Sequence, residues 1–420
     1  MRTGSLIAGL VCILFALLDA FQTIILPRRP QGRFRITRLF YIVTWRPWAF
    51  VALRISKRRV RDTFYSIYGP LSLLMLLAVW AVVLVVGYGL VYYALGTPFL
   101  DPMLPDSAGH GLNALRTDLY VSGTTIFTLG LGDVVPRTLA ARALLIVEAG
   151  NGLGFVAVVI GYLPVLYGAF SRREVSIALL DGRAGSPPTA TEMIRRHSFE
   201  GGTEALILLL EEWERWSAEL LESHISYPLL CYFRSQHDNQ SWLTSLTCIL
   251  DTCSLLIASI RGNSARQAQL TFAMARHAIA DLTQVFNQVP VAPPVDRLEA
   301  ETFAKMCSQL AESGVNLCGD RESAARLNTM RGLYEGHAQA LSVYLALPLQ
   351  PWVADRPVKS NWQTVSQVRS EAEAVLGLPV RGAMAERSFD GGTGGSRTGG
   401  GGAFGSGSSA QHDEDDEHHH

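Results

Sequence analysis

One stretch of this sequence restricts the fold more than any other: residues 70–96 contain no charged side chain. A helix rises about 1.5 Å per residue, so a stretch of this length crosses a hydrocarbon core of about 30 Å. Inside a bilayer the backbone must satisfy its own hydrogen bonds, and a helix does so. Residues 5–26, where Asp19 is the only charge, and residues 139–168 have a similar character. We therefore predict three transmembrane helices.

The composition is typical of a membrane protein and argues against several other classes. Of 420 residues, 48% are hydrophobic and 17% are charged, and the formal net charge is -1. Soluble enzymes usually carry more charge, and nucleic-acid-binding proteins usually present a basic face. The sequence shows no nucleophile elbow and no helix with paired metal ligands. We therefore expect neither an enzyme nor a nucleic-acid partner.

Basic residues mark one side of the membrane at every predicted crossing. Arginines between residues 28 and 38 follow the first helix, Lys57–Arg61 precedes the second, and Ser171–Arg173 follows the third. The positive-inside rule then places the amino terminus outside and the carboxy-terminal region in the cytosol of a multi-pass cell-membrane protein. A signal peptide is the alternative for residues 5–26, but this apolar run is long and lacks a convincing cleavage site.

Residues 34–56 leave their topology open. Aromatic and aliphatic residues alternate there with arginines, and Pro47 interrupts the middle. The arginines are spaced too irregularly for a voltage-sensor helix. We expect an interfacial helix or hairpin on the cytosolic surface, with Trp45 and Trp48 at the depth of the lipid headgroups.

The segment between the second and third helices is too short and too polar to cross. Residues 113–127 begin at Asn113, which can act as a cap, and predict a short helix that enters from outside. Its carboxy terminus would direct partial negative charge toward the membrane centre. Residues 128–133 (TLGLGD) must then climb back out, and their two glycines allow backbone conformations that line up carbonyl oxygens. Irregular backbone at this depth is tolerated where it lines a water-filled path.

This arrangement resembles the pore domain of the potassium channel superfamily, whose filter motif is Thr-Val-Gly-Tyr-Gly-Asp. The resemblance covers residues 70–170, about a quarter of the chain, and includes Pro136, Arg142 and Gly152 at the family's spacing after the filter. An extra amino-terminal helix and a helical cytosolic extension also look like a group of bacterial ion-channel proteins. The nucleotide-like glycine run at 150–154 follows no strand, so we do not read it as a phosphate loop.

The resemblance implies roles for individual filter residues. Carbonyl oxygens, with the Thr128 hydroxyl, would replace the water shell of K+, and Asp133 would anchor the outer mouth. Since one chain holds one motif, four chains would surround one axis as a homotetramer in the lipid bilayer. The filter differs from the family motif at Leu131, which removes an aromatic brace, while Phe127 and Thr124 are further departures. The implied ion-binding residues are Thr128, Leu129, Gly130, Leu131 and Gly132.

The third predicted helix would line the inner pore. By the family alignment, Gly152 is a hinge, Gly161 and Pro164 form a kink or gate, and the cavity is lined by Leu153, Val156 and Ile160. The alternatives are ordinary packing residues and a proline near the interfacial end of a helix. Glu148 and Asn151 are costly in lipid, so we expect hydrogen-bonding roles behind the filter, with Glu148 about two turns past Arg142.

Beyond a linker at residues 181–190, the sequence has helical periodicity and almost no strand signal. Helices are expected near 206–220, 243–257, 272–282, 296–312, 320–346 and 361–377, forming a cytosolic bundle without the βαβ pattern of a nucleotide-sensing domain. The polar patch at residues 234–242 is expected to be a solvated turn, with a ligand sensor as the alternative. All cysteines but Cys12 lie in this region, where thiols stay reduced, and we read them as buried apolar residues.

The prediction is an all-α membrane protein with three transmembrane helices, a re-entrant pore helix and filter, and a cytosolic helical bundle. Its expected parts are residues 1–68, the pore domain 69–172, the helical domain 173–381 and a Gly/Ser-rich disordered tail 382–420. The predicted function is passive K+ conduction, gated through the helical domain by an unknown ligand or partner, with no cofactor beyond the permeant ion. The alternatives are a non-conducting membrane sensor or scaffold and a weakly selective cation channel.

Overall fold

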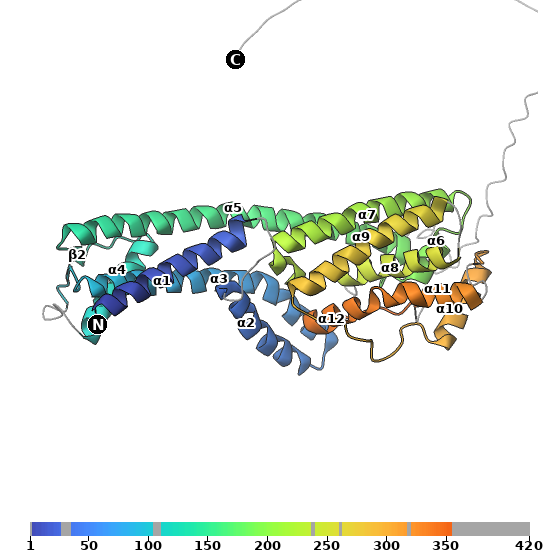
Figure 1. The fold of residues 1–420 in the computed structure, drawn as a ribbon, viewed down its shortest axis with the longest axis horizontal. Helices are drawn as coiled ribbons and strands as arrows, with labels where there is room; N and C mark the ends of the chain where they lie inside the picture. The colour runs from blue at the N-terminus through green and yellow to red at the C-terminus, as the bar shows by residue number, and fades with distance from the viewer. Residues whose placement is uncertain are drawn as a thin grey trace, which may run out of the picture. The chain divides into compact units, whose positions relative to one another are not determined.

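The computed structural model describes residues 2–26, 35–103, 111–236, 240–259, 263–316 and 321–354. The chain divides into two units, residues 1–362 and 363–420, and every element described below belongs to the first. These elements are almost all helices (Figure 1). The predicted class, an all-α membrane protein with a further helical region, is confirmed.

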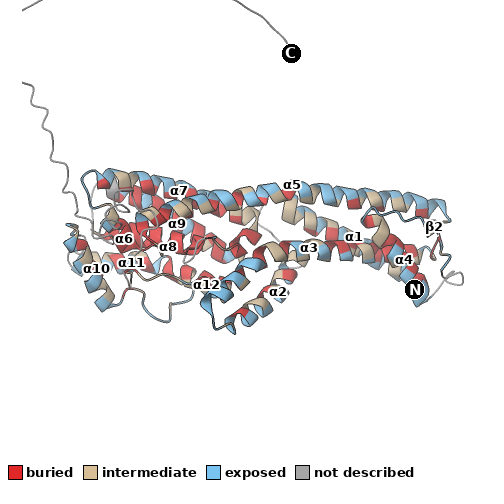
Figure 2. Ribbon diagram, turned by 180° about the vertical axis from the view of Figure 1, so that it is seen from behind, coloured by how far each residue is buried: buried red, intermediate tan, exposed pale blue. Residues whose placement is uncertain are grey.

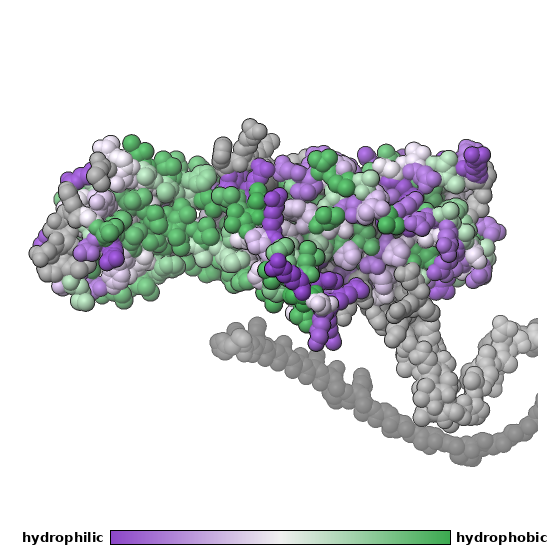
Figure 3. Space-filling view, turned by 90° about the horizontal axis from the view of Figure 1, so that it is seen from below, coloured by the Kyte–Doolittle hydropathy of each residue, from purple (hydrophilic) through white to green (hydrophobic). Residues whose placement is uncertain are grey.

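Three long apolar helices form the membrane part. They are α1 (Arg2–Ala20), which continues into the π-helical turn η1 (Phe21–Ile25), α3 (Arg58–Ala94) and α5 (Leu139–Ala184). Each is long and apolar enough to cross a membrane. Many of their apolar side chains are exposed, and the hydrophobic surface in Figure 3 lies over this part of the molecule. Contact of such a large apolar surface with water is unfavourable, whereas contact with lipid chains is favourable.

The charge inside α1 is held by partners from two other helices. Asp19 is buried, and its Oδ2 accepts hydrogen bonds from Trp80 Nε1 at 2.9 Å and from the Thr37 hydroxyl at 2.6 Å. Arg35 Nε lies 3.4 Å from Asp19 Oδ1. A buried carboxylate without such partners would cost several kcal/mol, about 3–5 when one partner of a pair is removed. Asp19 therefore joins the end of α1 to α3 and to the start of α2.

Helix α2 (Ile36–Leu53) is one continuous helix through Pro47. Its Trp45 is only 3% exposed and donates its Nε1 hydrogen bond to the Tyr344 carbonyl at 2.8 Å. The ring also packs against Tyr232, with centroids 5.0 Å apart. Trp45 therefore contacts protein and not lipid headgroups, because the helical domain offers it an apolar wall and a hydrogen-bond acceptor, and its depth in the membrane stays a prediction.

The segment between α3 and α5 contains the short helix expected there. Helix α4 (Leu112–Ile126) is followed by the residues of the predicted filter, and two short strands, β1 (Phe99–Leu100) and β2 (Val135–Pro136), pair antiparallel. The residue at the cap position of α4 is Gly111, with no side-chain cap bond, and Asn113 lies inside the helix. The predicted Asn113 cap is therefore wrong.

The helical domain follows α5 and is built around α8 (Trp242–Ser259). This helix is apolar enough to cross a membrane, but nearly all of its residues are buried inside the protein (Figure 2). Its neighbours shield it, as the prediction of a helix within the bundle requires. The other elements are α6 (Ala190–Arg196), α7 (Gly202–Ser226), the 3-10 turn η2 (Pro228–Tyr232), α9 (Asn263–Val285), α10 (Ala300–Glu312), α11 (Arg321–Gly332) and α12 (Glu335–Leu345).

Several details of the helical domain differ from the predictions. The helix expected at 320–346 is interrupted by a turn at Leu333 and Tyr334, which separates α11 from α12. The helix expected at 361–377 lies outside the described residues. Cys307 is disulfide-bonded, so the expectation of reduced thiols is wrong at that position. The buried, free thiols predicted in this region are found at Cys231, Cys248 and Cys253.

No flexible connection separates the third membrane helix from the helical domain. Helix α5 continues to Ala184, and the expected linker is reduced to a turn at residues 185–188. Arg173, on this extension, is 4% exposed and donates to the Leu230 and Phe233 carbonyls at 2.9 Å each. Its Nη1 also lies 3.1 Å from Nε2 of the buried His224. The extension of α5 is thus held inside the helical domain by a buried guanidinium.

Candidate functional site

The backbone of the predicted filter alternates in handedness. Thr128, Gly130 and Gly132 have φ values of 55°, 53° and 77°, in the left-handed region, whereas Leu129 and Leu131 between them do not. In a strand, every residue has negative φ and successive carbonyls point to opposite sides, but a positive φ at every second residue turns them toward the same side. Glycine adopts positive φ at little cost, which explains its spacing in TLGLGD. The arrangement matches what a row of oxygen ligands for a cation requires.

The carboxy-terminal end of α4 leads directly into this segment. The Thr128 amide donates to the Thr125 carbonyl at 2.9 Å, and the Leu129 amide donates to the Thr124 carbonyl at 2.8 Å. A left-handed residue at this point is a common way to end a helix, because it satisfies the last free carbonyls. The filter therefore begins where α4 carries its partial negative charge.

The far end of the predicted filter is hydrogen-bonded back to α4. Asp133 Oδ2 accepts a hydrogen bond of 2.6 Å from the Tyr120 hydroxyl, which belongs to α4. Beyond it, the Arg137 amide donates to the Pro98 carbonyl at 2.8 Å, next to the β1–β2 pair. Leu131 offers no aromatic brace, but the Tyr120–Asp133 bond fixes the segment two residues further on. Asp133 is thus anchored to α4, and its place at the outer mouth of a pore stays a prediction.

A buried carboxylate lies behind the pore helix. Glu148 of α5 is fully buried and accepts hydrogen bonds of 2.5 Å each from the Tyr92 hydroxyl of α3 and the Ser122 hydroxyl of α4. The neighbouring polar residue, Asn151, donates to the Tyr88 hydroxyl. The hydrogen-bonding role predicted for Glu148 is therefore present, but its partners are two hydroxyls and not Arg142. These bonds join α3, α4 and α5 to one another.

Gly152 lies where the end of the pore helix meets α5. A Cβ atom built on Gly152 would be 2.1 Å from the carbonyl oxygen of Ile126, the last residue of α4. Real Cβ contacts are longer than about 3.0 Å, so only glycine allows this approach. The structure thus gives Gly152 a packing function in a continuous α5, and the hinge assigned to it stays a prediction.

The remaining residues of the predicted inner pore are on exposed surfaces of the single chain. Leu153 and Ile160 are 65% and 66% exposed, and Val156 is also exposed. Gly161 is exposed with open space around it, and Pro164 lies within α5 without ending the helix. These positions can line a cavity between copies of the chain or face lipid. Their roles as cavity lining and gate stay predictions.

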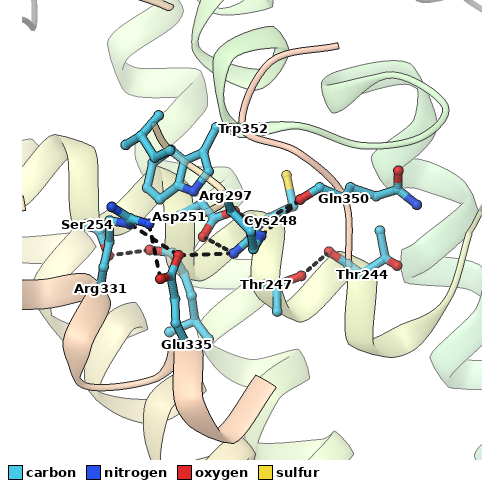
Figure 4. Close-up of polar contacts among 12 residues, drawn as sticks. Thr244, Thr247, Cys248, Asp251, Ser254, Arg297, Arg331, Glu335, Gln350 and Trp352 are labelled. Atoms are coloured by element: carbon cyan, nitrogen blue, oxygen red, sulfur yellow. Dashed lines mark hydrogen bonds and ion pairs between the residues drawn. The ribbon is translucent and has the colours of Figure 1, made fainter. Parts of the chain in front are cut away.

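The helical domain contains a second concentration of charge, shown in Figure 4. Arg297 donates to Asp251 and to the Gln350 carbonyl at 2.8 Å, and Arg331 donates to Glu335 at 3.1 Å. Every charged side chain of this cluster has an oppositely charged partner. These ion pairs and hydrogen bonds satisfy one another. We therefore interpret the cluster as a structural contact that holds the segments before α10 and after α12 against the domain, and not as a ligand site.

The polar patch that the sequence singled out at residues 234–242 is partly described. Arg234 donates to the Leu345 carbonyl at 2.7 Å and to the Ala346 carbonyl at 3.0 Å, and its guanidinium lies over the ring of Tyr65. Residues 237–239 lie outside the described residues. The described part of the patch therefore serves contacts within the protein, and among the described residues no group of three or more potential metal ligands is found.

The comparison with known families agrees with this geometry. Residues 80–166, which include the last part of α3, all of α4, the predicted filter and the first part of α5, match the family described as "Ion channel". The resemblance to a channel pore domain is confirmed. The chain is also 22% identical over 333 residues to the uncharacterized membrane protein YdjJ of Bacillus subtilis (strain 168), covering 76% of this chain and 92% of that protein. No solved structure matches the chain.

Three residues that support this ion-channel segment were missed by the sequence analysis. They are Tyr120, Tyr92 and Ser122, whose hydroxyls hold Asp133 and Glu148. For Tyr92 and Ser122, a hydroxyl on an apolar helix face is a signal that a buried acceptor lies opposite, because a buried donor needs a partner; the exposed Tyr120 gives no such signal. The sequence alone does not say which acceptor that is.

Proposed function

We propose that the protein is a potassium-selective channel that conducts K+ passively through a homotetrameric pore. The observation that carries the proposal is the alternation of backbone handedness at Thr128, Gly130 and Gly132. Dehydrated K+ needs oxygen ligands in place of its water shell, and carbonyls turned to one side provide successive rings of them when several chains meet. The ion-channel family match over residues 80–166 supports conduction as the activity.

The exposed surface of the channel segment supports assembly around an axis. Leu129 and Leu131 are 61% and 62% exposed, and α5 leaves Leu153 and Ile160 uncovered further along the chain. A single filter segment surrounds no ion by itself, so closed symmetry is needed to complete its oxygen rings. Four copies would place the segment of each chain around one path.

Planar-bilayer recordings of the purified full chain test potassium selectivity. The reversal potential is expected to shift by about 59 mV per tenfold K+ gradient, since K+ carries one charge, and to change little with Na+. Gly130→Ala forces a side chain into positive φ, at a cost of about 1–2 kcal/mol, and should abolish selective current. Gly123→Ala is the matched control, because its added Cβ meets nothing within 4 Å and its φ is not positive. A reversal potential that ignores the K+ gradient would contradict the proposal.

A weakly selective cation channel is the second candidate, and Leu131 is the observation that favours it. Its side chain is exposed and replaces an aromatic group that could brace the filter against the pore helix. A filter held mainly by the Tyr120–Asp133 bond would adapt more easily to a smaller ion. A sodium-to-potassium permeability ratio near one would support this candidate. A protein that assembles but carries no current would instead support a membrane sensor or scaffold.

We also propose the orientation and the route of gating. The amino terminus of α1 lies at the same end as α4 and β2, opposite the helical domain (Figure 1), which supports an outside amino terminus if the helical domain is cytosolic. Gating through this domain is supported by the continuous α5 and its buried Arg173. Accessibility of single cysteines introduced at Met103 and Val343, both exposed, would test the orientation.

A further inference from the structure

A pocket of about 490 Å³ lies where the helical domain meets the inner part of the membrane helices. Its walls come from η1, the start of α2, the middle of α3, η2 and the ends of α9 and α12. Tyr162 of α5 completes the lining, ten residues beyond Gly152. The pocket therefore touches the helix that would line the pore and the domain proposed to control it, but not the filter.

The walls of this pocket divide into an apolar part and a basic end. Leu73, Leu76, Leu229 and Phe286 are among its apolar lining residues. The basic end is formed within α2 and just before it, by Arg35 and Arg38 together with the hydroxyl of Thr37. A site with this distribution suits a ligand that has both a hydrocarbon part and an anionic group.

Among the described residues that line the pocket, one cation has no acidic partner. Arg35 is occupied, because it pairs with Asp19 and donates to the Thr23 hydroxyl at 2.8 Å. The carboxylate on the opposite wall, Asp281, lies 3.5 Å from His277. Arg38 is exposed and has no acidic partner among residues 2–26, 35–103 and the other described ranges. An anionic group at the pocket would therefore pair with Arg38.

The rim of the pocket continues into the apolar outer surface. Ile42 lines the pocket and is 40% exposed, and its neighbours on α2, Leu39 and Val43, are exposed as well. A small soluble anion would pair with Arg38 but leave the apolar walls without an apolar partner. An uncharged hydrocarbon would cover the apolar walls but leave Arg38 without an anionic partner. A ligand that enters from the lipid phase satisfies both features.

We propose that this pocket binds one hydrocarbon chain of an anionic amphiphile, whose phosphate or carboxylate group pairs with Arg38. The bound chain lies between Tyr162 of α5 and the walls contributed by η2, α9 and α12. It therefore bridges the proposed pore helix and the helical domain. This binding does not depend on whether the protein selects potassium, so it can be tested without measuring current.

The test is native mass spectrometry of the purified full chain in detergent, titrated with phosphatidylglycerol, phosphatidylcholine or inorganic phosphate. We expect retained phosphatidylglycerol at concentrations where phosphatidylcholine is lost. Arg38→Gln should weaken phosphatidylglycerol binding roughly fivefold, the effect of one partly exposed ion pair. Arg54→Gln is its control, because Arg54 lies at the other end of α2 and outside the pocket.

A second pair of variants tests the hydrocarbon chain and not the charge. Ile42→Trp places a large ring at the rim and should reduce binding by at least about tenfold, whereas Val43→Trp, on the exposed neighbouring position outside the pocket, should not. Both positions are exposed enough for the protein to fold. Equal retention of the two lipids, or equal binding by the two tryptophan variants, would overturn the proposal. Inorganic phosphate binding as tightly as phosphatidylglycerol would also overturn it, and would assign the site to a free anion.

Discussion

Replacing Gly152 by alanine separates a hinge from a packing contact. If Gly152 is only a hinge, alanine favours the helical conformation by about 0.5–1 kcal/mol and leaves the filter unchanged. In the structure, however, the new Cβ would lie 2.1 Å from the Ile126 carbonyl oxygen and 2.9 Å from its carbon. Relief of this overlap requires a shift of roughly 1–1.5 Å between α5 and the end of α4, given carbon contacts of about 3.5 Å.

The overlap lowers the stability of the folded protein, whereas the helix propensity of alanine raises it. Both overlapping atoms of Ile126 belong to the backbone, so no side chain can rotate away. Overpacking of this kind typically costs about 1–3 kcal/mol. After subtraction of the helix gain, we expect Gly152→Ala to destabilise the protein by about 1–2 kcal/mol. Because the displaced residues lead into Thr128, the permeability ratio should also change.

Thermal denaturation in detergent and bilayer recordings measure the two consequences. Gly154→Ala is the matched control on the same helix, since its added Cβ has no atom within 4 Å and only the helix gain remains. If Gly152→Ala were as stable as Gly154→Ala and changed only the open probability, the packing argument would be wrong and the hinge would be favoured.

Three further predictions concern buried polar groups. Glu148→Ala leaves the buried Tyr92 hydroxyl without its acceptor, while the Ser122 hydroxyl keeps the Val85 carbonyl at 3.0 Å; it should cost about 1–3 kcal/mol of unfolding free energy, and Glu148→Gln should cost less. Arg173→Met removes the donors to two buried carbonyls and should increase protease cleavage between α5 and the helical domain, which Arg173→Lys should partly prevent. Burial, together with the nearby Arg173, holds the pKa of His224 well below its ordinary 6.5. Below pH 6.5 the unfolded chain therefore binds a proton that the folded chain excludes, and stability should fall by up to about 1.4 kcal/mol per pH unit. His224→Gln should remove that slope in denaturation measurements.

The long apolar helices and the positive φ values at residues 130 and 132 could be predicted because local chemistry dictates them. A charge-free run such as residues 70–96 has few alternatives to a membrane helix, and Gly130 and Gly132 supply the positive φ values on which the filter backbone depends. The bundle helices followed from periodicity in the same way. The buried face of α7, which includes Trp213 and Leu220, repeats at helical spacing.

The structure differs from the sequence analysis where a residue had several partners to choose from. Trp45 is amphipathic and would suit a lipid interface, but the Tyr344 carbonyl from a distant part of the chain holds it inside the protein. Asn113 is a good capping residue, yet the helix begins one residue earlier, after Gly111. The propensity of such a residue indicates which local environments it favours, but contacts with distant parts of the chain decide which of them it occupies.

Three features followed from the sequence alone: the long apolar helices, the short segment between the second and third of them, and the glycines that allow positive φ at residues 130 and 132. Those properties depend on hydrophobic length and on backbone freedom, which neighbouring residues fix. Tertiary structure alone decided that Glu148 meets Tyr92 and Ser122, that Gly152 admits the end of α4, and that Arg38 borders an apolar pocket. These contacts join segments far apart in the chain. A buried polar group needs a hydrogen-bond partner, and the packing of the helices decides which partner lies within reach.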